Sequence, residues 1–197
     1  MTTDNTQVWM IAAVILLALG AVAWMIVRER RRRQSSRLRH RFGPEYLRVV
    51  SERGDRAKAE AELMAREKRV ERLKLVELTA EDASRFSQAW AAVQVRFVDN
   101  PKGAVVEADR LVRDLMVKRG YPMADFERRA ADISVQYPTV VEAYRSARAI
   151  AVRDQQGQAS TEELRQAIVF YRTLFDELLE IHRSKPAPAP LTETVHT

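Results

Sequence analysis

The strongest pattern in the chain is an unbroken apolar run near the N-terminus. Residues 8–27, VWMIAAVILLALGAVAWMIV, contain no charged side chain. As a helix this run is about 30 Å long, which matches the hydrocarbon core of a bilayer. The pattern predicts a transmembrane helix from Val8 to Val27. Trp9 and Trp24 lie near its ends, where indole rings favour the membrane boundary, so both are expected to belong to the membrane anchor.

Residues 42–183 show helical periodicity instead. Apolar residues recur at spacings of three and four, as at Phe86, Trp90, Val93 and Phe97. The segment contains no alternating strand of useful length. We therefore expect an all-α fold, with the N-terminal transmembrane helix followed by a soluble bundle of five or six helices.

Residues that cap or break helices mark the expected helix ends. Thr79 with Asp82 is typical of a helix N-terminus, and Ser160 with Glu163 forms a capping box. The other expected ends lie at Gly54, Asn100-Pro101, Gly120 and Tyr137-Pro138. After the last helix, residues 184–197 contain three Pro at alternate positions and are expected to be a disordered tail.

The helix expected over residues 55–73 is highly charged. One stripe contains Ala59, Leu63, Val70 and Leu73, and Arg66 interrupts it. Fewer than three clean heptads do not predict a coiled coil. A solvated helix with one narrow buried face is favoured over a dedicated oligomerisation helix.

The positive charge is concentrated beside the apolar run. The net charge is +6, yet residues 28–41 alone hold eight Arg and one Glu, whereas residues 42–197 hold 25 basic and 25 acidic residues. The eight are Arg28, Arg30, Arg31, Arg32, Arg33, Arg37, Arg39 and Arg41. Such a cluster is a stop-transfer and topology signal, and it can also contact anionic lipid. It has no interleaved aromatic residues to stack bases, so nucleic acid is not an expected partner.

The charge asymmetry also predicts orientation. Residues 1–7 carry Asp4 as their only charged side chain and are expected to be a short extracytoplasmic tail. The positive-inside rule places the Arg-rich juxtamembrane linker 28–41 and the helical domain 42–183 in the cytoplasm. The alternative is a secreted domain released by signal cleavage, since Ala21-Val22-Ala23 has a small-x-small form. A missing basic n-region and the arginines just past the cut oppose it.

Catalytic and metal-binding patterns are absent from the sequence. The chain has no Cys, which excludes disulfides, thiolate metal sites and a cysteine nucleophile. Its His residues, His40, His182 and His196, share no plausible helix face. We find no phosphate-binding loop, dinucleotide-binding turn or nucleophile elbow. We therefore expect no catalytic residue, no cofactor and no metal.

The carboxylates near the middle of the domain fit a structural role. Asp125, Glu127 and Asp132 lie among basic residues, which predicts a surface ion-pair network rather than an acid–base dyad. Arg96 and Asp99 beside the apolar stripe are interpreted as ordinary helix-end charges. Neither group indicates an enzyme.

Three blocks resemble a family of uncharacterised bacterial single-pass membrane-anchored proteins with a helical soluble domain. They are RFGPEY at 41–46, WAAVQVRFVDNP at 90–101 and ADISVQYPTVVEAYRSA at 131–147. The resemblance covers most of the helical domain and implies a bacterial origin and a short N-terminal anchor. It implies no activity and assigns no residue a role.

The leading functional hypothesis is a non-enzymatic inner-membrane protein. Its helical domain would recruit or scaffold another protein, or a second copy of itself, next to the lipid bilayer. The alternative is a membrane-anchored enzyme or small-ligand sensor that uses Arg, Tyr and carboxylate groups in a pocket between helices.

Overall fold

The structure is a computed structural model of the chain. It describes the backbone of residues 3–180 and the side chains of residues 16–179. The chain divides into two compact units, Met1–Glu60 and Ala61–Thr197. Within the described residues there are eight helices and no strand, which confirms the all-α class. The predicted tail 184–197 lies outside the described residues.

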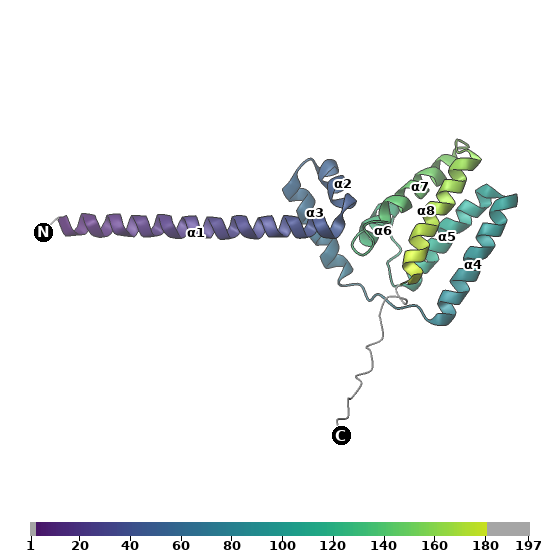
Figure 1. Ribbon diagram of the computed structural model, residues 1–197, viewed down its shortest axis with the longest axis horizontal. Coiled ribbons are helices and arrows are strands. Elements are labelled where there is room, and N and C mark those ends of the chain that lie inside the picture. Colours follow the sequence, from purple (N-terminus) through teal and green to yellow (C-terminus); the bar gives the residue numbers. More distant parts are fainter. Residues whose placement is uncertain (1–2, 181–197) are drawn as a thin grey trace, which may run out of the picture. The chain divides into compact units, whose positions relative to one another are not determined.

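The first unit is dominated by one long helix, α1 (Thr3–Phe42), which Figure 1 shows without a break. The segment named a linker, 28–41, is therefore helical. No proline or glycine lies between Ala21 and Phe42, and arginine is a good helix former, so the helix has no reason to end at the apolar boundary. The apolar and basic segments are parts of a single rod.

Glycines separate the helices that follow α1. Gly43 and Pro44 end α1 and begin α2 (Pro44–Arg53), with Pro44 in the first turn, where its missing N–H costs nothing. Gly54 has φ of 62°, a left-handed conformation, and its N–H donates to Val50 O at 3.0 Å. α3 (Arg56–Val70) follows. The buried side chains of the first unit include Leu38, Phe42, Tyr46, Val49 and Ala59.

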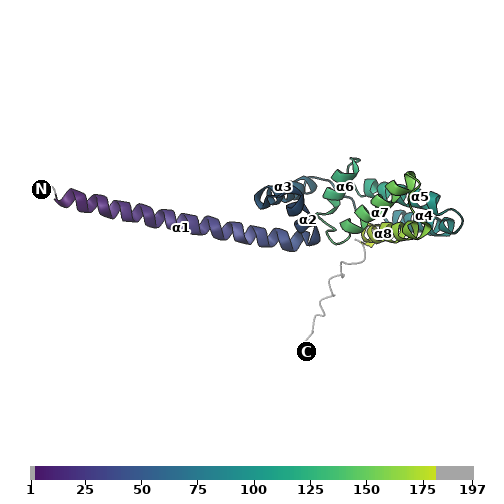
Figure 2. The ribbon, with the colours of Figure 1, turned by 90° about the horizontal axis from the view of Figure 1, so that it is seen from above.

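The second unit contains five further helices, α4 (Ala80–Asp99), α5 (Pro101–Lys118), α6 (Phe126–Ile133), α7 (Val141–Gln155) and α8 (Thr161–Glu180). In Figure 1 the four long helices lie in the order α7, α8, α5 and α4, and each contacts its neighbour in that order. The short α6 packs on α7 (Figures 1 and 2). Seven helices thus lie between residues 42 and 180, rather than the predicted five or six.

The predicted apolar stripes form the core of the second unit. Trp90 of α4 stacks on Phe175 of α8 with ring centroids 4.7 Å apart. Tyr144 and Tyr171 are fully buried where α7 meets α8. Phe97 at the end of the α4 stripe is only partly buried.

The predicted helix caps are confirmed. The Asp82 N–H donates to Thr79 Oγ1 at 3.1 Å. At the start of α8, the Ser160 N–H donates to Glu163 Oε2 at 2.8 Å and the Glu163 N–H donates to Ser160 Oγ at 3.3 Å. Hydrogen bonds from the Ser160 backbone and side chain, together with Arg153, lower the pKa of Glu163 to about 2.

The close approach of a loop explains why residue 120 is a glycine. This residue has φ of +89°, and a Cβ built on it would lie 2.5 Å from the carbonyl oxygen of Lys74. The loop is held there by the Val76 N–H, which donates to Arg119 O at 3.0 Å. Gly120 therefore ends α5, as expected, and its missing side chain leaves room for the 71–78 segment to pass close to the backbone.

Asp132 is buried, contrary to the sequence-based prediction of a surface ion-pair network. Asp132 is 1% exposed and pairs with Arg69 of α3, so it does not belong to a surface network. Arg66 is also buried and pairs with Glu62 one turn away. In each pair, the opposite charge offsets the free-energy cost of burying a charged side chain.

The other two carboxylates of that group are exposed, as predicted. Asp125 caps α6, where its Oδ1 accepts from the Arg128 N–H at 2.8 Å. Glu127 Oε2 lies 2.7 Å from Arg145 Nη1. Both therefore act locally, at a helix end and on the protein surface.

As far as side chains are described, no helix contains an apolar stretch long enough to cross a membrane. Residues 8–15, the first part of the predicted span, lie outside the described side chains, and so do the predicted anchors Val8 and Trp9.

Candidate functional site

Residues 16–27, the described part of the apolar half of α1, are exposed around the whole circumference of the helix. Every residue from 16 to 27 is exposed, including Leu17 at 75% and Trp24 at 62%. The side chain of Val27, the last residue of the predicted anchor, is also exposed. Soluble helices normally bury such a surface against a neighbouring element. This segment therefore presents an apolar surface that no described residue covers.

The eight predicted arginines follow on the same helix, and all are exposed. Arg28 Cζ lies 5.0 Å from the ring centroid of Trp24, a cation–π contact at the apolar–basic junction. Arg33 Nε donates to Glu29 Oε1 at 2.9 Å. Arg39 Cζ lies 5.5 Å from the ring of Tyr46. The arginines thus form a basic helical surface that begins where the apolar one ends.

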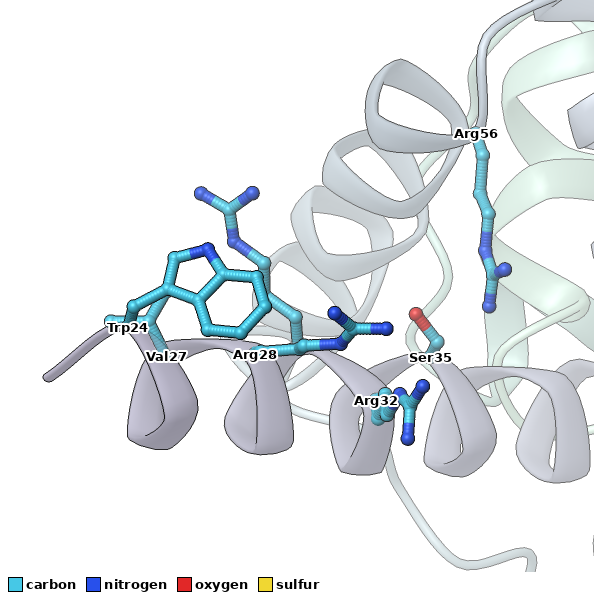
Figure 3. A pocket seen from close by; sticks show the side chains of 7 residues that line it. Trp24, Val27, Arg28, Arg32, Ser35 and Arg56 are labelled. Carbon is cyan, nitrogen blue, oxygen red and sulfur yellow. The ribbon is translucent and has the colours of Figure 1, made fainter. Parts of the chain in front are cut away.

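A hollow of about 500 Å³ lies at this junction (Figure 3). It is lined by Trp24, Val27, Arg28, Arg31, Arg32, Ser35 and Arg56. We call it the junction pocket. Figure 3 shows Arg56 reaching from the first turn of α3 toward α1. Four lining residues are arginines and none is a carboxylate, so the pocket can hold an anion with an apolar attachment.

The other predicted arginines lie outside the junction pocket. Arg30 and Arg33 line a second, mostly apolar hollow of about 280 Å³ with Met25, Ile26 and Glu29. Arg37, Arg39 and Arg41 lie farther along α1 and line neither hollow. Only part of the basic segment is therefore arranged as a pocket.

Arg56 is the lining residue of the junction pocket that sequence reasoning missed. It lies beyond α2, and the turns at Gly43 and Gly54 bring it back toward α1. Those two breaks were visible in the sequence and indicated a change of direction. Nothing in the sequence specified which arginine would meet the helix.

Glu60 holds the three helices of this unit together. Its Oε1 accepts from Tyr46 Oη at 2.8 Å and from Arg56 Nε at 2.9 Å, and Ser35 of α1 also hydrogen-bonds to it. Burial alone would raise the pKa of Glu60, but these hydrogen bonds outweigh it and leave the pKa below its ordinary value. Burial, followed by the hydrogen bond with Glu60, raises the pKa of Tyr46.

This arrangement predicts an acid-sensitive first unit. A carboxyl with a lowered folded-state pKa stabilises the fold above its unfolded pKa of about 4.3, and that contribution is lost as the pH falls through the folded value. At about pH 7, Glu60→Gln is expected to cost about 1–3 kcal/mol of unfolding free energy. Below about pH 4 the wild type should approach the variant.

Urea unfolding of the full chain in detergent, followed by circular dichroism across this pH range, measures the difference. Glu52→Gln, on the exposed side of α2, is the matched control and should stay within about 0.5 kcal/mol of wild type. A Glu60→Gln cost that persisted unchanged in acid would contradict the assignment.

Metal binding has no support in the described part of the chain, where no three His, Asp or Glu side chains lie close enough to share an ion. The lining of the junction pocket contains one hydroxyl, Ser35, beside its four arginines. Neither family models, nor curated proteins, nor solved structures match this chain.

Proposed function

We propose that this protein is a single-pass protein of the bacterial inner membrane. Residues 8–27 would span the bilayer, with residues 1–7 outside and the helical domain in the cytoplasm. In that location the domain acts as a non-enzymatic scaffold that recruits a protein partner or a second copy of the chain.

The exposed apolar surface of α1 is the observation that carries this proposal. Eight large apolar side chains between residues 16 and 27 are each at least 48% exposed. Complete transfer of such a side chain out of water contributes about 1.5–3 kcal/mol, so together they represent on the order of 10 kcal/mol. A bilayer removes this apolar surface from water on all sides of the helix, whereas a protein partner usually covers one face.

The basic half of α1 supports the orientation. Arginines beside a span remain on the cytoplasmic side. Each basic residue close to an anionic leaflet contributes on the order of 1 kcal/mol. With Trp24 at the boundary, the junction pocket would hold a lipid phosphate between its arginines.

Alkaline carbonate extraction of cell membranes tests the anchor. Wild type is expected in the pellet. The double variant Leu16→Arg and Leu19→Arg should shift to the soluble fraction, because each central arginine costs about 2.5–3.5 kcal/mol of insertion free energy. The matched control places the same two charges at Val95 and Val98, which are 71% and 82% exposed on α4, and should stay in the pellet.

A wild-type chain that carbonate releases would contradict the anchor. A mature chain that begins near Trp24 would instead support the secreted alternative. Both outcomes are read from the same fractions, by immunoblot and by mass spectrometry of the N-terminus.

Exposed apolar residues of the second unit support the proposed scaffold role. Val95 and Val98 lie one turn apart on α4 with little cover. Cross-linking in intact cells is expected to recover a protein partner or a dimer, and Val95→Arg with Val98→Arg should reduce its yield. Recovery of lipid alone would contradict the scaffold and leave the anchor standing.

One observation favours a second candidate, a membrane-anchored small-ligand sensor. A pocket between α5, α6 and α7 contains converging Arg and Asp side chains.

A further inference from the structure

The second unit contains a pocket of about 280 Å³ in which five charged side chains meet. Asp109 and Arg113 come from α5, Arg129 from α6, and Arg148 and Asp154 from α7. We call it the α5–α7 pocket. Its volume is just below the range of about 300–1,000 Å³ usual for drug-sized ligands, so its occupant must be small.

One arginine in the pocket is already neutralised. Arg113 Nη2 lies 3.1 Å from Asp109 Oδ2. The other oxygen of Asp109 accepts from the buried Tyr171 Oη at 3.0 Å. Asp109 is 7% exposed, and these two partners compensate its charge. This pair therefore contributes no net charge to a ligand.

The other two arginines have no carboxylate partner among the described residues, although each is held in place. Arg129 Nε donates to Tyr144 Oη at 3.4 Å, and its Nη1 donates to Ala124 O. Arg148 Cζ lies 5.9 Å from the ring centroid of Phe126. With Asp154 as the remaining carboxylate, these two oriented guanidinium groups leave the pocket with a net positive charge. Guanidinium presents paired N–H donors that fit the oxygens of carboxylate and phosphate.

Asp154 adds an acceptor that has no hydrogen bond. Its side chain is 9% exposed, and within the described residues no donor lies within hydrogen-bond distance of Oδ1. Lys102 Nζ lies 3.8 Å from Asp154 Oδ1, beyond hydrogen-bond distance. A buried carboxylate oxygen without a donor costs free energy unless a water or a ligand supplies the donor.

We propose that the α5–α7 pocket binds a small oxyanion that also carries a hydrogen-bond donor. Arg129 and Arg148 hold the anionic oxygens, and Asp154 accepts the O–H or N–H. A protonated phosphate or phosphomonoester fits this description, as does a small hydroxycarboxylate. The proposal does not depend on the membrane anchor, because every residue involved belongs to the second unit.

Titration calorimetry of the full chain in neutral-lipid nanodiscs tests the site. The probes are inorganic phosphate, glycolate and sulfate. Phosphate or glycolate is expected to bind saturably. Whichever of the two probes binds more tightly shows whether the ligand's oxyanion is a phosphate or a carboxylate. Sulfate has no proton to donate to Asp154 at neutral pH, so it should bind at least about tenfold more weakly than phosphate.

Arg148→Gln and Arg129→Gln should each weaken binding at least about tenfold. Arg148→Lys, which keeps the charge, should weaken it less. The matched control is Arg172→Gln, an exposed arginine on α8 that lines neither pocket, which should leave this binding unchanged. Asp154→Asn should bring the affinities for phosphate and sulfate close together, because an amide does not require a donor from the ligand.

Near-ultraviolet circular dichroism checks that each variant keeps its tertiary packing. If Arg129→Gln loses that signal, Arg148→Gln decides, since Arg148 has a ring contact and no ion pair among the described residues. Absence of saturable binding by phosphate and glycolate overturns the site. Binding that survives Arg148→Gln but is abolished by Arg31→Gln lies in the junction pocket and also overturns the site. Equal binding of sulfate overturns the role of Asp154.

Discussion

Replacing Arg69 with methionine is expected to lower the unfolding free energy of the chain by about 3–5 kcal/mol. Arg69 Nε and Nη2 lie 2.7 Å and 2.6 Å from the same oxygen of Asp132, which is 1% exposed. Asp132 Oδ2 has no hydrogen bond in the described structure. Methionine keeps much of the side-chain length but leaves Asp132 charged and buried alone. Urea unfolding monitored by circular dichroism measures the loss.

The double variant Arg69→Met and Asp132→Leu separates two quantities. One is the free-energy cost of leaving one partner unpaired, and the other is the net contribution of the pair to stability. Replacing both partners by apolar residues removes the isolated charge, so most of the lost stability should return. Arg172→Met, which breaks an exposed pair with Asp176 on α8, is the matched control and should cost less than about 1 kcal/mol. An Arg69→Met cost as small as this control would show that Asp132 is solvated.

Trp90→Ala is expected to have a similar effect, about 3–5 kcal/mol, for a different reason. Trp90 is 4% exposed and stacks on Phe175, which is 1% exposed, with an angle of 24° between the rings. Alanine removes the contact between α4 and α8 and leaves a cavity that a packed core closes only in part. The shift of the urea unfolding midpoint measures the cost.

Trp90→Phe provides the control for volume and polarity. The indole Nε1 is buried and has no acceptor among the described residues, so phenylalanine removes an unsatisfied donor while keeping an aromatic ring over Phe175. This variant is expected to stay within about 1.5 kcal/mol of wild type. A phenylalanine variant as unstable as the alanine variant would mean that the indole N–H has a partner, such as a bound water.

Helix caps and core stripes were predictable because the interactions that produce them lie within a few residues of each other in the chain. Thr79 caps α4 through an amide three residues away, and Ser160 and Glu163 cap α8 over the same distance. The spacing that places Trp90 in the core is a property of one helix. These predictions needed no knowledge of which helices are neighbours.

The burial of Asp132 was not predictable in this way. Its partner Arg69 is 63 residues away in the chain, and both residue types are usually exposed. Their pairing depends on how α3 and α6 meet within the second unit. Spacing along one helix therefore predicted a surface network where the fold makes a buried pair.

The sequence by itself determined the helical class, the main helix ends, the core stripes and the junction between the apolar and basic segments, because periodicity, capping and charge asymmetry act over one or two turns. Only the tertiary structure decided which charged groups meet: Arg56 with the start of the basic helix, Asp132 with Arg69, and Arg129 with Arg148 around Asp154. Those encounters depend on how separate helices pack, and a charged residue has the same local pattern whether it meets solvent, a partner or an empty pocket.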